Sequence, residues 1–79
     1  MIIKVTQENI DKGIAGDCSR CPIALALGRA FPTACILSHY KLIRVNHFEF
    51  YRIPQSVINF MNDFDHHQEV SPFEFELTN

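Results

Sequence analysis

The feature that most constrains the fold is a helix-forming segment, residues 22–30, which is apolar on nearly every side. It begins at Cys21-Pro22, and proline fits the first helical position because its missing N–H would lack a partner there in any case. A helix that is hydrophobic all round must be buried on most of its sides. We therefore expect it to be the core of the domain, with Gly28 as a point of close packing and Pro32 as its stop.

The other segments predict strands and two further helices around this core. Short alternating or apolar runs indicate strands. Spacing of apolar residues at i, i+3, i+4 and i+7 indicates an amphipathic helix after Pro54. Thr6 is a suitable N-cap for a short first helix. The expected strands are residues 2–5, 34–37, 41–45, 48–52 and 73–77, and the expected helices are residues 7–13, 22–30 and 54–64.

The order of these elements, roughly β-α-α-β-β-β-α-β, predicts the α+β class. The sheet is expected to be small and mostly antiparallel, with four to five strands and with two to three helices on one face. Asn46-His47 is expected to form a two-residue turn between two of the strands, because asparagine tolerates a positive φ. A chain of 79 residues makes one domain at most, so residues 1–79 are treated as one unit.

The composition limits the location and the partners. No apolar run approaches the roughly 20 residues that span a bilayer. The N-terminus alternates like a strand and lacks the basic and apolar regions of a secretory signal, so a cytoplasmic location is expected. A pI of about 6.0 without a basic stripe gives no support for nucleic-acid binding.

Charge is divided unevenly along the chain. Residues 1–52 hold all seven Lys and Arg with four acids, a net +3, whereas residues 53–79 hold five acids and no Lys or Arg, a net −5. These acids can be ordinary solvated residues, or they can form a surface that meets a basic partner. The candidate partner-binding residues are Asp63, Asp65, Glu74 and Glu76.

The cysteines match one metal-binding pattern. Cys18, Cys21, Cys35 and His39 have the spacing C-x2-C-x13-C-x3-H, which falls within the range of Cys3His zinc sites. A helix over residues 22–30 advances about 13 Å, and five extended residues can return about 16 Å, so Cys35 can come back beside Cys18. The opposing interpretation is that Cys35 lies in a buried strand, where cysteine usually acts as a small hydrophobic residue.

A third interpretation is thiol–disulfide exchange between Cys18 and Cys21. Cys21 lies at a helix N-terminus, which favours the thiolate. The pattern fails in detail, because in glutaredoxins the first cysteine of the pair lies at the helix start, and here the second does. The sequence shows no other catalytic arrangement, and we expect no enzyme activity and no cofactor, zinc being the one alternative.

Several phrases of the sequence resemble a group of small phage and prophage proteins that have no assigned activity. They are Ile-Lys-Val-Thr-Gln-Glu-Asn-Ile-Asp-Lys-Gly (3–13), Gly-Asp-Cys-Ser-Arg-Cys-Pro-Ile-Ala-Leu-Ala-Leu (16–27), Phe-Tyr-Arg-Ile-Pro (50–54), Phe-Met-Asn-Asp-Phe-Asp (60–65) and Pro-Phe-Glu-Phe-Glu-Leu (72–77). The resemblance implies an accessory protein that works inside a bacterial host. In that group the Cys-Pro-Ile-Ala-Leu helix start recurs, whereas Cys35 and His39 do not recur reliably, which weakens the zinc interpretation.

Small size, the uneven charge and this resemblance together favour a non-catalytic protein that binds a host or phage protein, for example as an inhibitor of host defence or regulation. A homodimer is also plausible, because a small sheet leaves an edge strand to cover.

Overall fold

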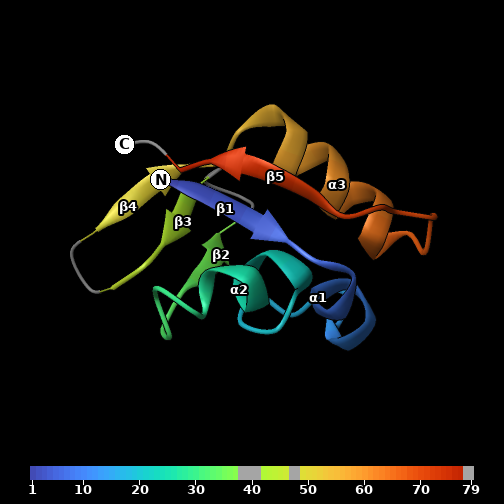
Figure 1. Ribbon diagram of the computed structural model, residues 1–79, viewed down its shortest axis with the longest axis horizontal. Helices are drawn as coiled ribbons and strands as arrows, with labels where there is room; N and C mark the ends of the chain where they lie inside the picture. Colours follow the sequence, from blue (N-terminus) through green and yellow to red (C-terminus); the bar gives the residue numbers. More distant parts are fainter. Residues whose placement is uncertain (38–41, 47–48, 78–79) are drawn as a thin grey trace.

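The elements of the chain follow the expected order (Figure 1). The structure is a computed structural model, and it describes residues 1–37, 42–46 and 49–77. Within these ranges the elements are β1 (Ile2–Val5), α1 (Gln7–Lys12), α2 (Pro22–Leu27), β2 (Cys35–Leu37), β3 (Leu42–Arg44), β4 (Phe50–Arg52), α3 (Gln55–Asp65) and β5 (Phe73–Glu76).

The strands in the described ranges form two antiparallel sheets. β1 and β5, from opposite ends of the sequence, make a two-stranded ribbon in which Ile3 lies opposite Phe75. β2, β3 and β4 make a three-stranded sheet in which Ile43 lies opposite both Ile36 and Tyr51. The expected α+β class, antiparallel pairing and element order are confirmed, but the strands are divided between two sheets.

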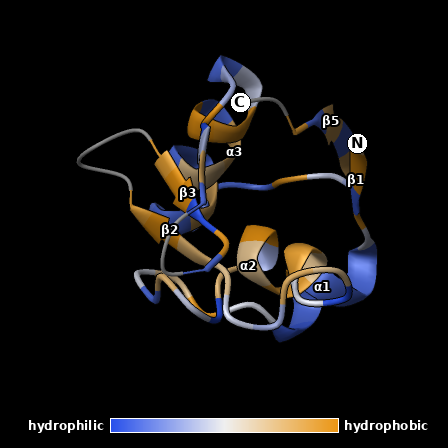
Figure 2. Ribbon diagram, turned by 90° about the vertical axis from the view of Figure 1, so that its left-hand side faces the viewer, coloured by the Kyte–Doolittle hydropathy of each residue, from blue (hydrophilic) through white to orange (hydrophobic). Residues whose placement is uncertain are grey.

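The hydrophobic core lies between the two sheets. Figure 2 shows the β1–β5 ribbon and the β2–β3 strands on opposite sides of the molecule, with α2 below and α3 above the space between them. α2 contacts strands of both sheets. Ile23 and Leu27 of α2, Val57 of α3 and Ile43 of β3 are all 0% exposed. The prediction that the apolar helix is central is therefore confirmed.

The chain is compact for its length. The radius of gyration is 11.1 Å, against about 12 Å expected for a folded domain of this size. In the part of the chain that the structure describes, no helix has the length and apolar character needed to cross a membrane.

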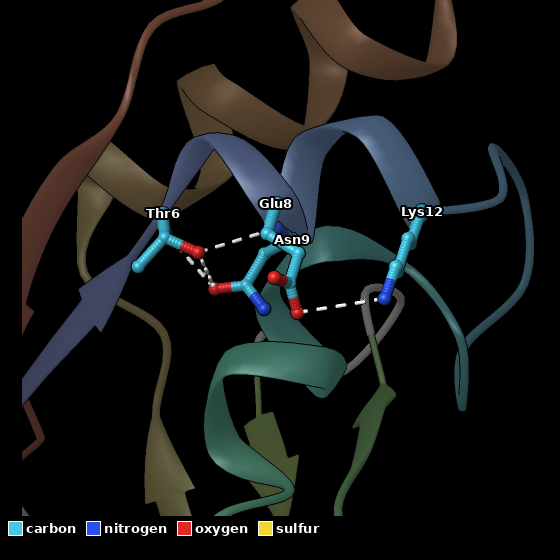
Figure 3. Close-up of polar contacts among 4 residues, drawn as sticks. All are labelled: Thr6, Glu8, Asn9 and Lys12. Atoms are coloured by element: carbon cyan, nitrogen blue, oxygen red, sulfur yellow. Dashed lines mark hydrogen bonds and ion pairs between the residues drawn. The ribbon is translucent and has the colours of Figure 1, made fainter.

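α1 is short, and its first turn is fixed by the predicted cap. Thr6 Oγ1 accepts a hydrogen bond from the Asn9 backbone N–H at 3.2 Å, and Asn9 Oδ1 accepts from the Thr6 backbone N–H at 2.9 Å (Figure 3). This reciprocal capping box satisfies two backbone donors that a helix start leaves open. Lys12 lies 3.5 Å from Glu8 one turn earlier, an exposed pair of small energetic value (Figure 3).

Close packing involves a different glycine from the one expected. A Cβ on Gly13 would stand 2.5 Å from Cγ of Pro22, so the C-terminal end of α1 fits against the first residue of α2 only without a side chain. Gly28 instead ends α2, and a Cβ there would meet backbone atoms of its own helix. α2 therefore ends at Leu27, three residues before the expected end at Ala30.

The connection between β3 and β4 is one residue longer than the expected turn. Val45 N–H donates to the Glu49 carbonyl at 3.1 Å, and Asn46 Oδ1 accepts from Glu49 N–H at 2.9 Å. Three residues, 46–48, therefore lie between the paired residues, and the predicted two-residue turn Asn46-His47 is wrong. The Asn46 side chain closes the turn by bonding to a backbone group three residues on, an alternative for asparagine that the prediction did not consider. His47 itself lies outside the described residues.

Candidate functional site

The loop between α1 and α2, residues 13–21, is held by its own hydrogen bonds. Asp17 Oδ1 accepts from the backbone N–H groups of Ser19 at 2.9 Å and of Arg20 at 3.0 Å. The Asp17 carbonyl accepts from Cys21 N–H at 2.9 Å. These bonds fold the chain tightly around Asp17, because a short side-chain acceptor can close a turn on the residues that follow it.

This loop carries Cys18 to the edge of the three-stranded sheet. The Cys18 carbonyl accepts a hydrogen bond from Ile36 N–H of β2 at 3.0 Å. Cys35 directly precedes Ile36, and its thiol lies near enough to that of Cys18 to lower the pKa of Cys18. The prediction that Cys35 can return to the side of Cys18 is therefore confirmed.

Cys35 is buried, at 7% exposure, but it does not belong to the central hydrophobic cluster. Alternation along the strands places it on the face that it shares with its cross-strand neighbour Arg44, while Ile36 and Ile43 face the core. Cys35 is thus buried next to Cys18 and beside a guanidinium, a more polar setting than the strand-core position expected from the sequence.

Cys21 lies at the helix start that the sequence predicted, and it has a structural role there. It is the N-cap of α2, and its Sγ accepts from Ala24 N–H at 3.4 Å. It is 2% exposed and part of the core cluster, so its thiol is enclosed by apolar neighbours. Cys18, by contrast, is exposed, and all three cysteines are free thiols.

The thiols differ in acidity for clear physical reasons. Hydrogen bonds from the Cys35 thiol and then from the Ser19 hydroxyl, 3.7 Å away, lower the pKa of Cys18. Burial, followed by the hydrogen bond to Cys18, raises the pKa of Cys35 to about 11. Burial also raises the pKa of Cys21. Cys18 is therefore the thiol of the three that ionises first.

A small cavity of about 80 Å³ opens beside Cys18 and Cys21. Its other walls come from Asp17, Met61 and Asp65, with Gly16 and Ile36. Asp65 of α3 also accepts from Gly16 N–H at 3.2 Å, so it ties the loop to the helix. The volume holds two or three water molecules and is well below the roughly 300 Å³ of a small-molecule site.

The predicted zinc ligands are only partly brought together. Cys18, Cys21 and Cys35 lie in one region, whereas His39 lies outside the described residues. Among residues 1–37, 42–46 and 49–77, no three Cys, His, Asp or Glu side chains are arranged to hold a metal ion. The four-ligand site stays a prediction.

The four predicted partner-binding acids occupy two parts of the molecule. Glu74 and Glu76 are exposed on one face of β5, as strand alternation predicts. Asp63 and Asp65 are exposed on α3, but residues two apart on a helix point to different sides. Asp65 belongs to the cavity beside the cysteines, so the four do not act as one cluster.

Two members of the cysteine region were not expected from the sequence. Asp17 organises the loop and Arg44 approaches Cys35 across the β2–β3 pair. The sequence Asp-Cys-Ser-Arg could have identified this role of Asp17, because an aspartate often accepts hydrogen bonds from the backbone N–H groups two and three residues after it. The position of Arg44 depends on strand register, which single residues do not specify.

A comparison with protein-family models, curated proteins and solved structures finds no match for this chain.

Proposed function

We propose that this protein is a non-catalytic accessory protein that acts by binding another protein in the cytoplasm of a bacterial host, as phage inhibitors of host defence or regulation do. The observation that carries the proposal is the outer face of the β1–β5 ribbon. Ile2 and Lys4 of β1 and Glu74 and Glu76 of β5 all point away from the core and are exposed. We call these four residues the ribbon face.

One acid of the ribbon face, Glu76, is paired, but weakly. Glu76 Oε1 lies 3.0 Å from the N-terminal ammonium, and both groups are more than half exposed. Glu74 lies directly opposite Lys4 across the strands. An exposed ion pair contributes about 0–1 kcal/mol, so a basic group of a partner can displace the N-terminal ammonium from Glu76 at little cost.

The ribbon face also offers an apolar contact and backbone groups. Ile2 is 53% exposed and Met1 is 61% exposed next to it. In a two-stranded ribbon each strand is an edge strand, and edges accept added strands from partners. The partner that fits is a protein segment with basic and apolar residues in alternation. Asp63 is a possible outlying contact, whereas the bond from Gly16 already engages Asp65.

The test compares three baits in bacterial lysate: the unaltered protein, Glu74→Gln with Glu76→Gln, and a control with Glu8→Gln and Asp11→Asn on α1. Both variants remove two exposed carboxylates, so they match in charge. Quantitative mass spectrometry should find proteins that the unaltered and control baits retain and that the ribbon-face variant loses, with capture weakening as salt rises. Equal capture by all three baits would remove the ribbon face from consideration.

The homodimer stays a prediction with its own test. β4 is an outer strand of the three-stranded sheet, and its Phe50 is 45% exposed. Sedimentation of the unaltered protein and of Phe50→Ser at several concentrations distinguishes the cases. A dimer that forms through β4 dissociates more readily in the variant.

A further inference from the structure

The two neighbouring thiols Cys18 and Cys35 have complementary positions. Cys18 is exposed in the 13–21 loop, where a reagent in solution can reach it, and Cys35 is buried behind it on β2. The backbone bond between the Cys18 carbonyl and Ile36 N–H holds the loop against the strand at this point. The two cysteines are therefore held side by side, close enough for each thiol to shift the pKa of the other.

Their surroundings distinguish the two roles needed for disulfide exchange. Cys18 is the exposed thiol, so a reagent in solution meets it first, and its thiolate is the attacking form of cysteine. Cys35 is only 7% exposed and is therefore shielded from a reagent in solution. A second thiol next to an exposed thiolate is the usual arrangement of a resolving cysteine.

We propose that Cys18 and Cys35 form a redox site that a low-molecular-weight disulfide oxidises to an intramolecular disulfide. The Cys18 thiolate attacks one sulfur of the small disulfide, forms a mixed disulfide and releases one thiolate. Cys35 then loses its proton to solvent and attacks the Cys18 sulfur, which releases the second thiolate. The two cysteine thiols are oxidised by two electrons, and the small disulfide is reduced to two thiols.

Cys21 is not part of this site in the structure. Its sulfur caps α2 through Ala24 N–H and is enclosed in the core. The pair expected from the sequence, Cys18 with Cys21, would require that cap to break. The Cys18–Cys35 bond requires that two neighbouring sulfurs approach to about 2 Å, and the backbone bond from Ile36 N–H already holds Cys18 beside β2. The product would tie the 13–21 loop to β2 and close a loop that contains α2.

The sequence makes the bond simple to identify, because trypsin separates the three cysteines. Cleavage after Lys12, Arg20, Arg29 and Lys41 places Cys18, Cys21 and Cys35 in peptides 13–20, 21–29 and 30–41. Reduced protein in chelator is exposed to glutathione disulfide, remaining thiols are alkylated, and the digest is read by mass spectrometry. We expect peptide 13–20 to be linked to peptide 30–41. A link between 13–20 and 21–29, or no link, would overturn the proposal.

Variants test the two roles separately. Cys35→Ser should accumulate one glutathione on Cys18, since no resolving thiol remains, and Cys35→Ala provides the same measurement if serine is poorly tolerated there. Cys18→Ser should react at least ten times more slowly, because the thiols that remain are buried. Cys21→Ser is the matched control and should form the bond at the unaltered rate. Equal rates for Cys18→Ser and the unaltered protein would contradict the proposal.

Discussion

At the scale of single residues, Gly13 is the position with the least room for a side chain. Its backbone is extended, with φ −69° and ψ 148°, so alanine fits the local conformation. The obstacle is Pro22, whose Cγ and Cδ would lie 2.5 and 2.6 Å from the new Cβ. Gly13→Ala should lower the free energy of unfolding by about 1–3 kcal/mol, as other overpacked positions do. Urea unfolding monitored by circular dichroism measures the loss.

Gly16 provides the control for this prediction. A Cβ there meets nothing within 4 Å, but its φ of +77° strains any L side chain, so Gly16→Ala should cost about 1–2 kcal/mol for a conformational reason alone. Pro22→Ala should recover part of the loss in Gly13→Ala and none of it in Gly16→Ala. Strictly additive effects of Gly13→Ala and Pro22→Ala would show that the two residues do not clash.

The acidity of Cys35 makes stability depend on alkaline pH. In the unfolded chain this thiol ionises near its ordinary pKa of 9.0, whereas in the folded protein burial raises its pKa to about 11. The unfolded state therefore loses the proton first, and the contribution of Cys35 to stability declines between pH 9 and pH 11. The difference in free energy of unfolding between the unaltered protein and Cys35→Ala, measured in reductant, should fall over that range. A constant difference would contradict the raised pKa.

Residue-level expectations held where one local rule decided the outcome. The start of α2 at Cys21-Pro22 and the cap of α1 by Thr6 follow from neighbouring residues, and the structure confirms both. Close packing was assigned to Gly28 instead of Gly13, because the clash at Gly13 arises only when α1 and α2 are placed against each other. The chain between Cys18 and Cys35 is long enough for the two residues to meet, as the sequence analysis stated. The difference in pKa between their thiols depends on burial, which the sequence does not specify.

At the scale of elements, α1 depends on its cap because it has only six residues. Asn9 is 8% exposed, and its Oδ1 accepts from both the backbone N–H and the hydroxyl of Thr6. Asn9→Ala should destabilise the protein by about 1–2 kcal/mol through the loss of these bonds. Asn9→Asp keeps the accepting oxygen near the positive helix end and should cost much less. Thermal unfolding compares them, and equal losses would exclude the cap as the cause.

Elements were predicted well where periodicity was strong. The bounds of α3 follow from its apolar spacing, and those of β5 from strict alternation. The turn after β3 was misjudged by one residue, because the Asn46 side chain supports a longer connection as readily as a two-residue turn. That one residue sets the register of β4, and hence which of its side chains face outward, since successive strand residues alternate in direction.

At the scale of the whole molecule, the division into two sheets was not predicted. Pairing of β1 with β5 joins residues 68 to 74 positions apart, from Val5 with Phe73 to Ile2 with Glu76, and no local pattern encodes such a pairing. Each sheet exposes one face and buries the other, so both need apolar cover. α2 contacts strands of both sheets at once, which explains why the apolar helix is buried on nearly every side, and α3 packs Phe60 against Phe73 of β5.

This shared core predicts that the two sheets unfold together. Phe60 of α3 packs its ring 4.8 Å from that of Phe73 in β5, a strand of the two-stranded ribbon. Phe60→Leu, which removes part of this contact, should cost about 1–3 kcal/mol. Native-state hydrogen exchange should show the same loss of protection at the slowest amides of β5 and of β3, because one core cluster joins both sheets. Phe50→Leu, at an exposed position of β4, should leave the protection of the amides in β5 and in β3 unchanged. Loss confined to the β1–β5 ribbon would mean that the sheets are separate units held together only at their surfaces.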